Sequence, residues 1–151
     1  MQILYKVFDH YKDHVVSGEL LAAIINEGRA KLGFDEVVFL GLDKAQIARE
    51  ASKLLQLSES EIKKAISTLP KTIDVGSGLS FIFHTEKTYK NINSKPTEKH
   101  YVFAPLLSES RLKLISQSGF CEGVMGAAEE HCPCTWVGLA EYLKYCKAER
   151  L

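Results

Sequence analysis

The residues best suited to metal chemistry lie in the last third of the chain. Thiolates and imidazoles gathered in a short stretch can hold zinc or an iron–sulfur cluster. The candidates are Cys121, His131, Cys132, Cys134 and Cys146. Their spacing lacks a paired C-x2-C, and the adjacent His131 and Cys132 do not easily reach one ion. Cys121 and Cys146 also fall on apolar stripes, which favours buried core positions for these two.

Redox chemistry at Cys132-Pro133-Cys134 is an alternative to metal binding. We expect this segment at a turn before a helix, where backbone amides can lower the pKa of a thiol and make it reactive. A metal-responsive or redox-responsive regulator is therefore one functional alternative. Apart from zinc or an iron–sulfur cluster at these cysteines, we expect no cofactor.

Catalytic signatures are absent from the sequence. It contains no P-loop, HExxH, nucleophile elbow or dinucleotide fingerprint, and Gly76-x-Gly78 is interpreted as a turn. Four histidines have no carboxylate or nucleophile at a spacing that indicates a dyad: His10, His14, His84 and His100. We therefore predict that the protein is not an enzyme.

Apolar residues at helical spacing predict helices over most of Ile3 to Leu32, with a break at Ser17-Gly18. The positions are Leu4, Phe8, Tyr11, Val15, Leu21, Ile24, Ile25 and Gly28. Gly33 is expected to end the second of these helices. The β-branched and aromatic run Glu36 to Leu40 predicts a buried strand.

Two short helices with good start signals follow that strand. Asp43 with Gln46, and Ser58 with Glu61, each have the spacing of a capping box. The apolar stripes behind them are Ile47, Ala48, Ala51, Leu54 and Leu55, then Ile62, Ala65, Ile66 and Leu69. The two helices are expected to meet at Gln56-Leu57-Ser58.

Beyond Pro70 the apolar pattern alternates, which predicts strands at Ile73 to Val75, Leu79 to Phe83 and Tyr101 to Phe103. Gly76-Ser77-Gly78 is expected to be a tight turn. The polar stretch Thr85 to Lys99 is expected to join its flanking strands as a long hairpin tip. Helices are predicted from Ser108 onward, with apolar positions at Leu112, Ile115, Cys121, Val124, Met125, Ala128, Trp136, Leu139, Leu143 and Cys146.

Composition indicates one soluble globular domain spanning residues 1–151. The chain is 46% hydrophobic and 25% charged, and its 19 basic side chains balance 19 acidic ones. We see no membrane span and no signal peptide. The four cysteines then indicate a reducing compartment and a cytoplasmic location. A neutral chain has no net field to attract a polyanion, which counts against generic nucleic-acid binding.

The order strand, helix, turn, helix and hairpin over residues 36–104 resembles the winged helix-turn-helix superfamily. The resemblance implies an α+β fold with a helical N-terminal segment, a small antiparallel sheet and a C-terminal helical extension over residues 105–151. It also implies that Ser58 to Leu69 is a recognition helix lying in the major groove of DNA. Its candidate DNA-binding residues are Ser58, Ser60, Lys63, Lys64 and Ser67, joined by Lys87, Lys90, Lys95 and Lys99 on the hairpin tip.

The function predicted from this resemblance is non-catalytic binding of duplex DNA by a transcriptional regulator. The recognition helix lacks Arg, Asn and Gln, so high sequence specificity is not evident. A protein-interaction adaptor on the same scaffold is the alternative. The apolar stripe of Trp136, Leu139, Leu143 and Cys146 suits either a core or a homodimer interface.

Overall fold

The chain folds into alternating strands and helices. The computed structural model describes residues 1–8, 16–91, 96–129, 139, 143 and 147–151. The strands are β1 (Gln2–Phe8), β2 (Glu36–Gly41), β3 (Lys71–Gly76), β4 (Leu79–Thr85), β5 (His100–Leu106), β6 (Cys121–Glu129) and β7 (Glu149–Arg150). The helices are α2 (Gly18–Leu32), α3 (Lys44–Ser52), α4 (Glu59–Ala65), α5 (Glu86–Lys90) and α6 (Glu109–Ser116).

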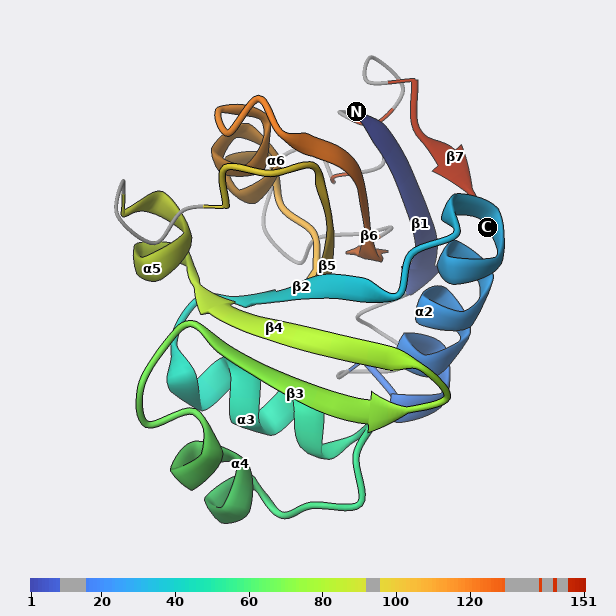
Figure 1. Ribbon diagram of the computed structural model, residues 1–151. Helices are drawn as coiled ribbons and strands as arrows, with labels where there is room; N and C mark the ends of the chain where they lie inside the picture. The colour runs from blue at the N-terminus through green and yellow to red at the C-terminus, as the bar shows by residue number, and fades with distance from the viewer. Residues whose placement is uncertain (9–15, 92–95, 130–138, 140–142, 144–146) are drawn as a thin grey trace, which may run out of the picture.

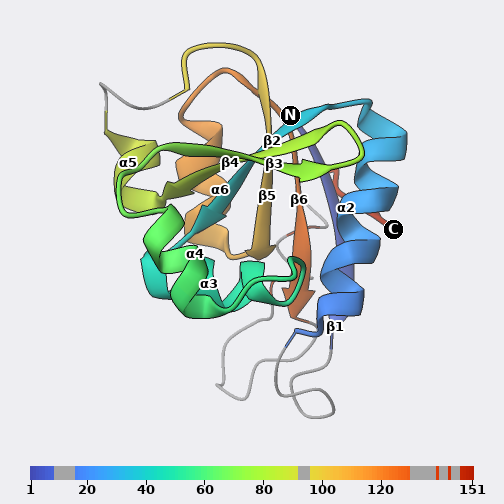
Figure 2. The same ribbon diagram turned by 60° about the horizontal axis from the view of Figure 1, so that its bottom comes forward.

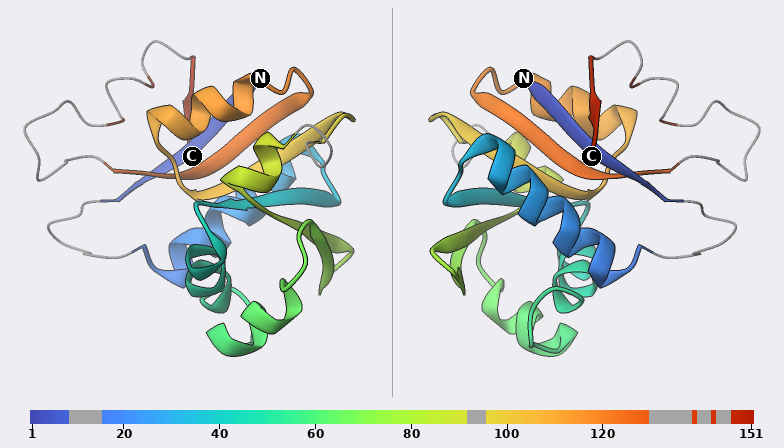
Figure 3. Two further views of the ribbon diagram at one scale, coloured as in Figure 1. Left: turned by 90° about the vertical axis from the view of Figure 1, so that its left-hand side faces the viewer. Right: turned by 90° about the vertical axis from the view of Figure 1, so that its right-hand side faces the viewer.

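All of these strands belong to one seven-stranded sheet, in the order β3-β4-β2-β5-β6-β1-β7 (Figure 1). Neighbouring strands run parallel, except that β3 is antiparallel to β4 at one edge. Helices α2, α3 and α4 cover one face (Figure 2), and α5 and α6 cover the other (Figure 3). A largely parallel sheet with helices on both faces is an α/β architecture.

Each face of the sheet buries its own apolar core, because successive side chains of a strand point to opposite faces. In β2, Val37 and Phe39 pack beneath α2, α3 and α4, whereas Val38 and Leu40 pack beneath α5 and α6. Phe39 is fully buried, and its ring lies 5.2–5.4 Å from the rings of three phenylalanines on the adjacent strands: Phe81, Phe83 and Phe103. β2 therefore contributes fully buried side chains to both cores.

Several local predictions are confirmed. Gly33 ends α2 with a left-handed backbone conformation (φ 73°), which its lack of a Cβ permits. Asp43 caps α3, and Ser58 and Glu61 form the expected capping box of α4. The hairpin of β3 and β4 turns at Gly76-Ser77-Gly78, and α6 forms over its predicted apolar positions.

The predicted fold class is wrong. Residues 1–8 were expected to belong to a helical segment. They form β1 instead, which pairs in parallel with β6. Ile3 faces one core, and Leu4 and Phe8 face the other. A strand buried on both faces does not alternate between apolar and polar residues, so the four-residue spacing of Leu4 and Phe8 imitated a helix.

The hairpin expected between β4 and β5 does not exist either. Both strands pair in parallel with β2, one on each side of it. The small antiparallel sheet expected from the winged-helix resemblance is therefore not formed by these strands. The stretch expected to be a hairpin tip contains α5, which begins at a Thr85–Thr88 capping box. The usual box has Glu or Gln at its last position, so Thr88 gave no recognised start signal.

β6 also replaces a predicted helix. Cys121, Val124, Met125 and Ala128 have helical spacing, yet they lie on a strand whose residues Gly123–Ala128 are all buried. A Cβ on Gly126 would collide with the carbonyl oxygen of Ala104 on β5. The small residues of β6 therefore serve the close approach of the central strands rather than a helix.

Replacing Phe39 with alanine is expected to destabilise the protein by about 3–5 kcal/mol, because it removes the ring at the centre of the aromatic core. Phe120→Ala is the matched control, since this ring is 46% exposed, and its effect is expected to stay within about 0.5 kcal/mol. Urea unfolding of both variants measures the difference. Equal effects of the two substitutions would contradict the placement of β2 between β4 and β5.

Candidate functional site

The connections at the carboxyl end of the sheet diverge around β2. β2 leads into α3 on one face, whereas its neighbours β4 and β5 lead into α5 and α6 on the opposite face. Where connections leave adjacent parallel strands towards opposite faces, a crevice opens at the strand ends, and ligands of open α/β sheets bind in such crevices. The topology therefore points to the carboxyl ends of β2 and β4.

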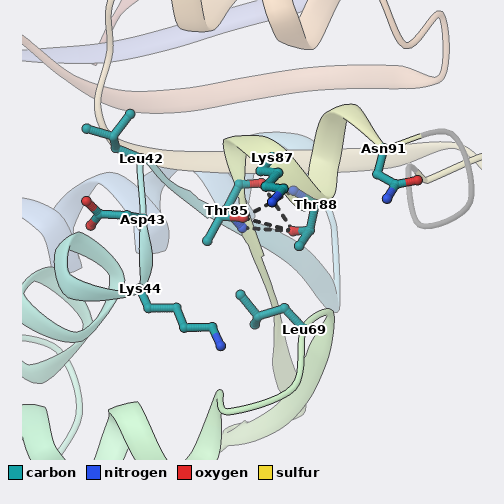
Figure 4. Close-up of a pocket in the computed structure, with 8 residues that line it drawn as sticks. All are labelled: Leu42, Asp43, Lys44, Leu69, Thr85, Lys87, Thr88 and Asn91. Carbon is teal, nitrogen blue, oxygen red and sulfur yellow. Dashed lines mark hydrogen bonds between the residues drawn. The ribbon is translucent and has the colours of Figure 1, made fainter.

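A pocket of about 460 Å³ lies at this position (Figure 4). We call it the switch pocket. It is lined by residues that follow β2, by residues at and after the end of β4, and by one residue ahead of β3: Leu42, Asp43, Lys44, Leu69, Thr85, Lys87, Thr88 and Asn91. Its volume is within the range typical of small-molecule sites.

The α3 side of the switch pocket is fixed by local hydrogen bonds. The Asp43 carboxylate accepts from the backbone amide of Gln46 at 2.8 Å, and the Gln46 side chain accepts from the amide of Leu42 at 2.6 Å. The ammonium of Lys44 donates to the carbonyl of Ser67 at 2.8 Å. Asp43 thus occupies the amino end of α3, and the positive charge on this side of the pocket comes from Lys44.

The opposite wall is the short helix α5. The Thr85 hydroxyl accepts from the amide of Thr88 at 3.1 Å, and the Thr88 hydroxyl accepts from the amide of Thr85 at 3.0 Å. Five residues of helix are marginal on their own, so packing must hold α5 in place. Tyr89 provides it, because its fully buried ring lies in the core shared with α6.

A polar network ties α5 to β5. His100 Nδ1 donates to the carbonyl of Glu98 at 2.8 Å, which leaves Nε2 as the acceptor for the Tyr89 hydroxyl at 2.8 Å. Burial raises the pKa of Tyr89 to about 12, so the phenol keeps the proton that it donates. Burial also lowers the pKa of His100, which favours the neutral acceptor form.

The buried Arg111 connects three elements beneath the crevice. Its Nε donates to the Glu86 carboxylate of α5 at 3.0 Å, and its terminal nitrogens donate to the Leu106 carbonyl at 2.6 Å and to the Gln46 side chain at 3.3 Å. A buried guanidinium needs such partners to offset its desolvation. This role could not be predicted from the sequence, because the partners of Arg111 lie 5 to 65 residues away along the chain.

The structure places the predicted DNA-binding residues in several parts of the fold. Ser60, Lys63 and Lys64 are exposed on α4, and Ser58 is the exposed N-cap ahead of it. Ser67 is exposed but lies beyond the end of the helix, because α4 stops at Ala65. Lys87 and Lys90 lie on α5 instead of a hairpin tip. Lys99 pairs with Glu122 at 3.5 Å, and Lys95 lies outside the described residues.

The proposed metal ligands are not brought together by the part of the chain that is described. Cys121 lies at the start of β6, and burial raises its pKa to about 12, which disfavours the thiolate that a metal or a redox reaction requires. His131, Cys132, Cys134 and Cys146 lie outside the described residues. Zinc or iron–sulfur binding by these residues stays a prediction.

Two members of the proposed dimer stripe are already packed within the chain. Leu139 and Leu143 belong to the core beneath α5 and α6 and are 8% and 2% exposed. Trp136 and Cys146 lie outside the described residues, and homodimerisation stays a prediction. None of the described helices has the length and apolar character that crossing a bilayer requires.

Comparison with known proteins gives no family assignment: no protein-family model, curated protein or solved structure matches the chain.

We expect the stability of the protein to fall as the pH drops from about 7 to about 5. Burial and the nearby His100 lower the pKa of His84 to about 4, from the value of 6.5 expected in the unfolded chain. Between these two pKa values, His84 binds a proton in the unfolded state but not in the folded state. The contribution of the neutral His84 to the free energy of unfolding is fully present above pH 6.5. It decreases as the pH falls, and about 2 kcal/mol of it is lost at pH 5.

Urea unfolding of the wild-type protein and of His84→Gln across this pH range tests the assignment. Glutamine cannot take up a proton, so the variant is expected to show a shallower pH dependence, whatever its stability at pH 7. Parallel pH profiles for the two proteins would show that His84 does not carry this effect.

Proposed function

We propose that the protein binds a small anionic organic molecule in the switch pocket. The observation that carries the proposal is the coincidence of this pocket with the point where the connections from β2 and β4 leave towards opposite faces. The two walls of the switch pocket are the start of α3 and the helix α5, and each follows one of two adjacent parallel strands. Such an arrangement supports a preformed site.

The lining indicates a ligand with both apolar and anionic parts. Leu42 and Leu69 offer apolar surface, and Leu42 is 56% exposed. Lys44 and Lys87 bring two positive charges against the single carboxylate of Asp43. The hydroxyl and amide groups of Thr85, Thr88 and Asn91 add polar surface between them.

Binding of duplex DNA stays a prediction, but one of the two elements expected to contact the DNA has not formed. The hairpin expected to hold the DNA backbone is absent, because β4 and β5 flank β2. Lys63 and Lys64 still present two exposed charges on α4, outside the switch pocket. Charge reversal at these lysines and at the pocket lysines therefore separates the two functions.

The fluorescent apolar anion 8-anilinonaphthalene-1-sulfonate is a suitable first probe. We expect saturable binding at one site and about tenfold weaker binding by Lys87→Glu, a difference of ~1.4 kcal/mol, because the substitution places a negative charge beside the sulfonate. Lys63→Glu, on α4, is the matched control and is expected to bind the probe as the wild-type protein does. Fluorescence titration measures all three proteins.

Circular dichroism melting of the same variants checks that each remains folded, since partly unfolded proteins also bind this probe. Equal weakening by the two substitutions, or fluorescence that never saturates, would contradict a site in the switch pocket. A gel shift with duplex DNA that is lost in Lys63→Glu but kept in Lys87→Glu would support the DNA-binding function in its place.

A further inference from the structure

A second, smaller pocket lies on the other side of α5. It has a volume of about 370 Å³ and is lined by Glu86, Lys87, Lys90, Ser110 and Leu114. Lys87 lines this pocket and the switch pocket alike. The two pockets therefore share this lysine as a common wall.

The helical spacing of α5 explains how one short helix serves both pockets. Thr88 and Asn91 face the switch pocket, whereas Glu86 and Lys90 face the second pocket. Lys87 projects between these two directions, and Tyr89 projects into the core. α5 therefore separates the two pockets, and the buried Tyr89 anchors it in the core.

The two pockets differ in chemistry. Lys87 and Lys90 are both exposed, and they lie one turn apart on the same side of α5. The one carboxylate of the second pocket, Glu86, is already paired with the buried Arg111 at 3.0 Å. The second pocket therefore keeps the charge of two lysines, with the Ser110 hydroxyl beside them, while Leu42 and Leu69 give the switch pocket its apolar surface.

We infer that the ligand is a nucleoside monophosphate, with its nucleoside in the switch pocket and its phosphate between Lys87, Lys90 and Ser110 in the second pocket. This inference rests on the proposed function, because it assumes that the switch pocket binds a ligand. Lysine ammonium groups and a hydroxyl are suitable donors to a phosphate dianion. A flat base fits against the leucines, and a ribose fits the polar groups beside them.

Calorimetric titration of the full chain tests the inference. The probes are the four ribonucleoside 5′-monophosphates, each compared with its own nucleoside, together with ribose 5-phosphate and inorganic phosphate. We expect at least one monophosphate to bind about tenfold more tightly than its nucleoside, and more tightly than ribose 5-phosphate or inorganic phosphate. Lys90→Gln is expected to weaken that monophosphate about fivefold and to leave the nucleoside unchanged.

Lys113→Gln is the control, because Lys113 is exposed on α6 and pairs with Glu109 outside both pockets. It is expected to leave every affinity unchanged. A nucleoside that binds as tightly as its monophosphate, or equal loss for both in Lys90→Gln, would overturn the inference. Failure of all four monophosphates while the anilinonaphthalene probe still binds in the switch pocket would also overturn it, and the proposed function would stand.

Discussion

The structure depends on the position of β2 between two parallel neighbours. Because β2 is hydrogen-bonded to β4 on one side and β5 on the other, both of its edges are occupied, and both of its faces lie in apolar cores. Parallel neighbours cannot be joined by tight turns, so each connection must cross a face of the sheet. The connection after β2 crosses one face and those after β4 and β5 cross the other, which opens the crevice where the switch pocket lies.

The second constraint is the placement of α5 by side chains that lie behind it or at its first turn. A helix of five residues has too few internal hydrogen bonds to persist alone. Tyr89 fixes it through its buried ring and through its hydrogen bond to His100, and Glu86 fixes its first turn through Arg111. The wall between the two pockets therefore depends on Tyr89, His100 and Arg111, none of which lines either pocket. Binding and stability are expected to be linked through these anchors.

Local signals in the sequence predicted local structure well. The caps at Asp43 and Ser58 and the left-handed Gly33 depend on short-range hydrogen bonds and backbone freedom, which a few neighbouring residues determine. The pairing of β2 with β4 and β5 depends on contacts far apart in the chain, so β4 and β5, separated by one polar stretch, resembled a hairpin. Lys87 and Lys90 were predicted to be DNA-binding residues on a hairpin tip, whereas their surroundings on α5, and the role of Arg111, followed only from the sheet.

Nuclear Overhauser effects between strands report which strands are neighbours, so they test the position of β2 without any assumption about a ligand. With β2 between its parallel partners, Phe39 is expected to show contacts to both Phe83 and Phe103, and Val38 to both Ile82 and Val102. Backbone contacts between β4 and β5 are expected to be missing. An antiparallel ladder joining Phe83 directly to Tyr101 would contradict this arrangement and remove the crevice from which both pockets follow.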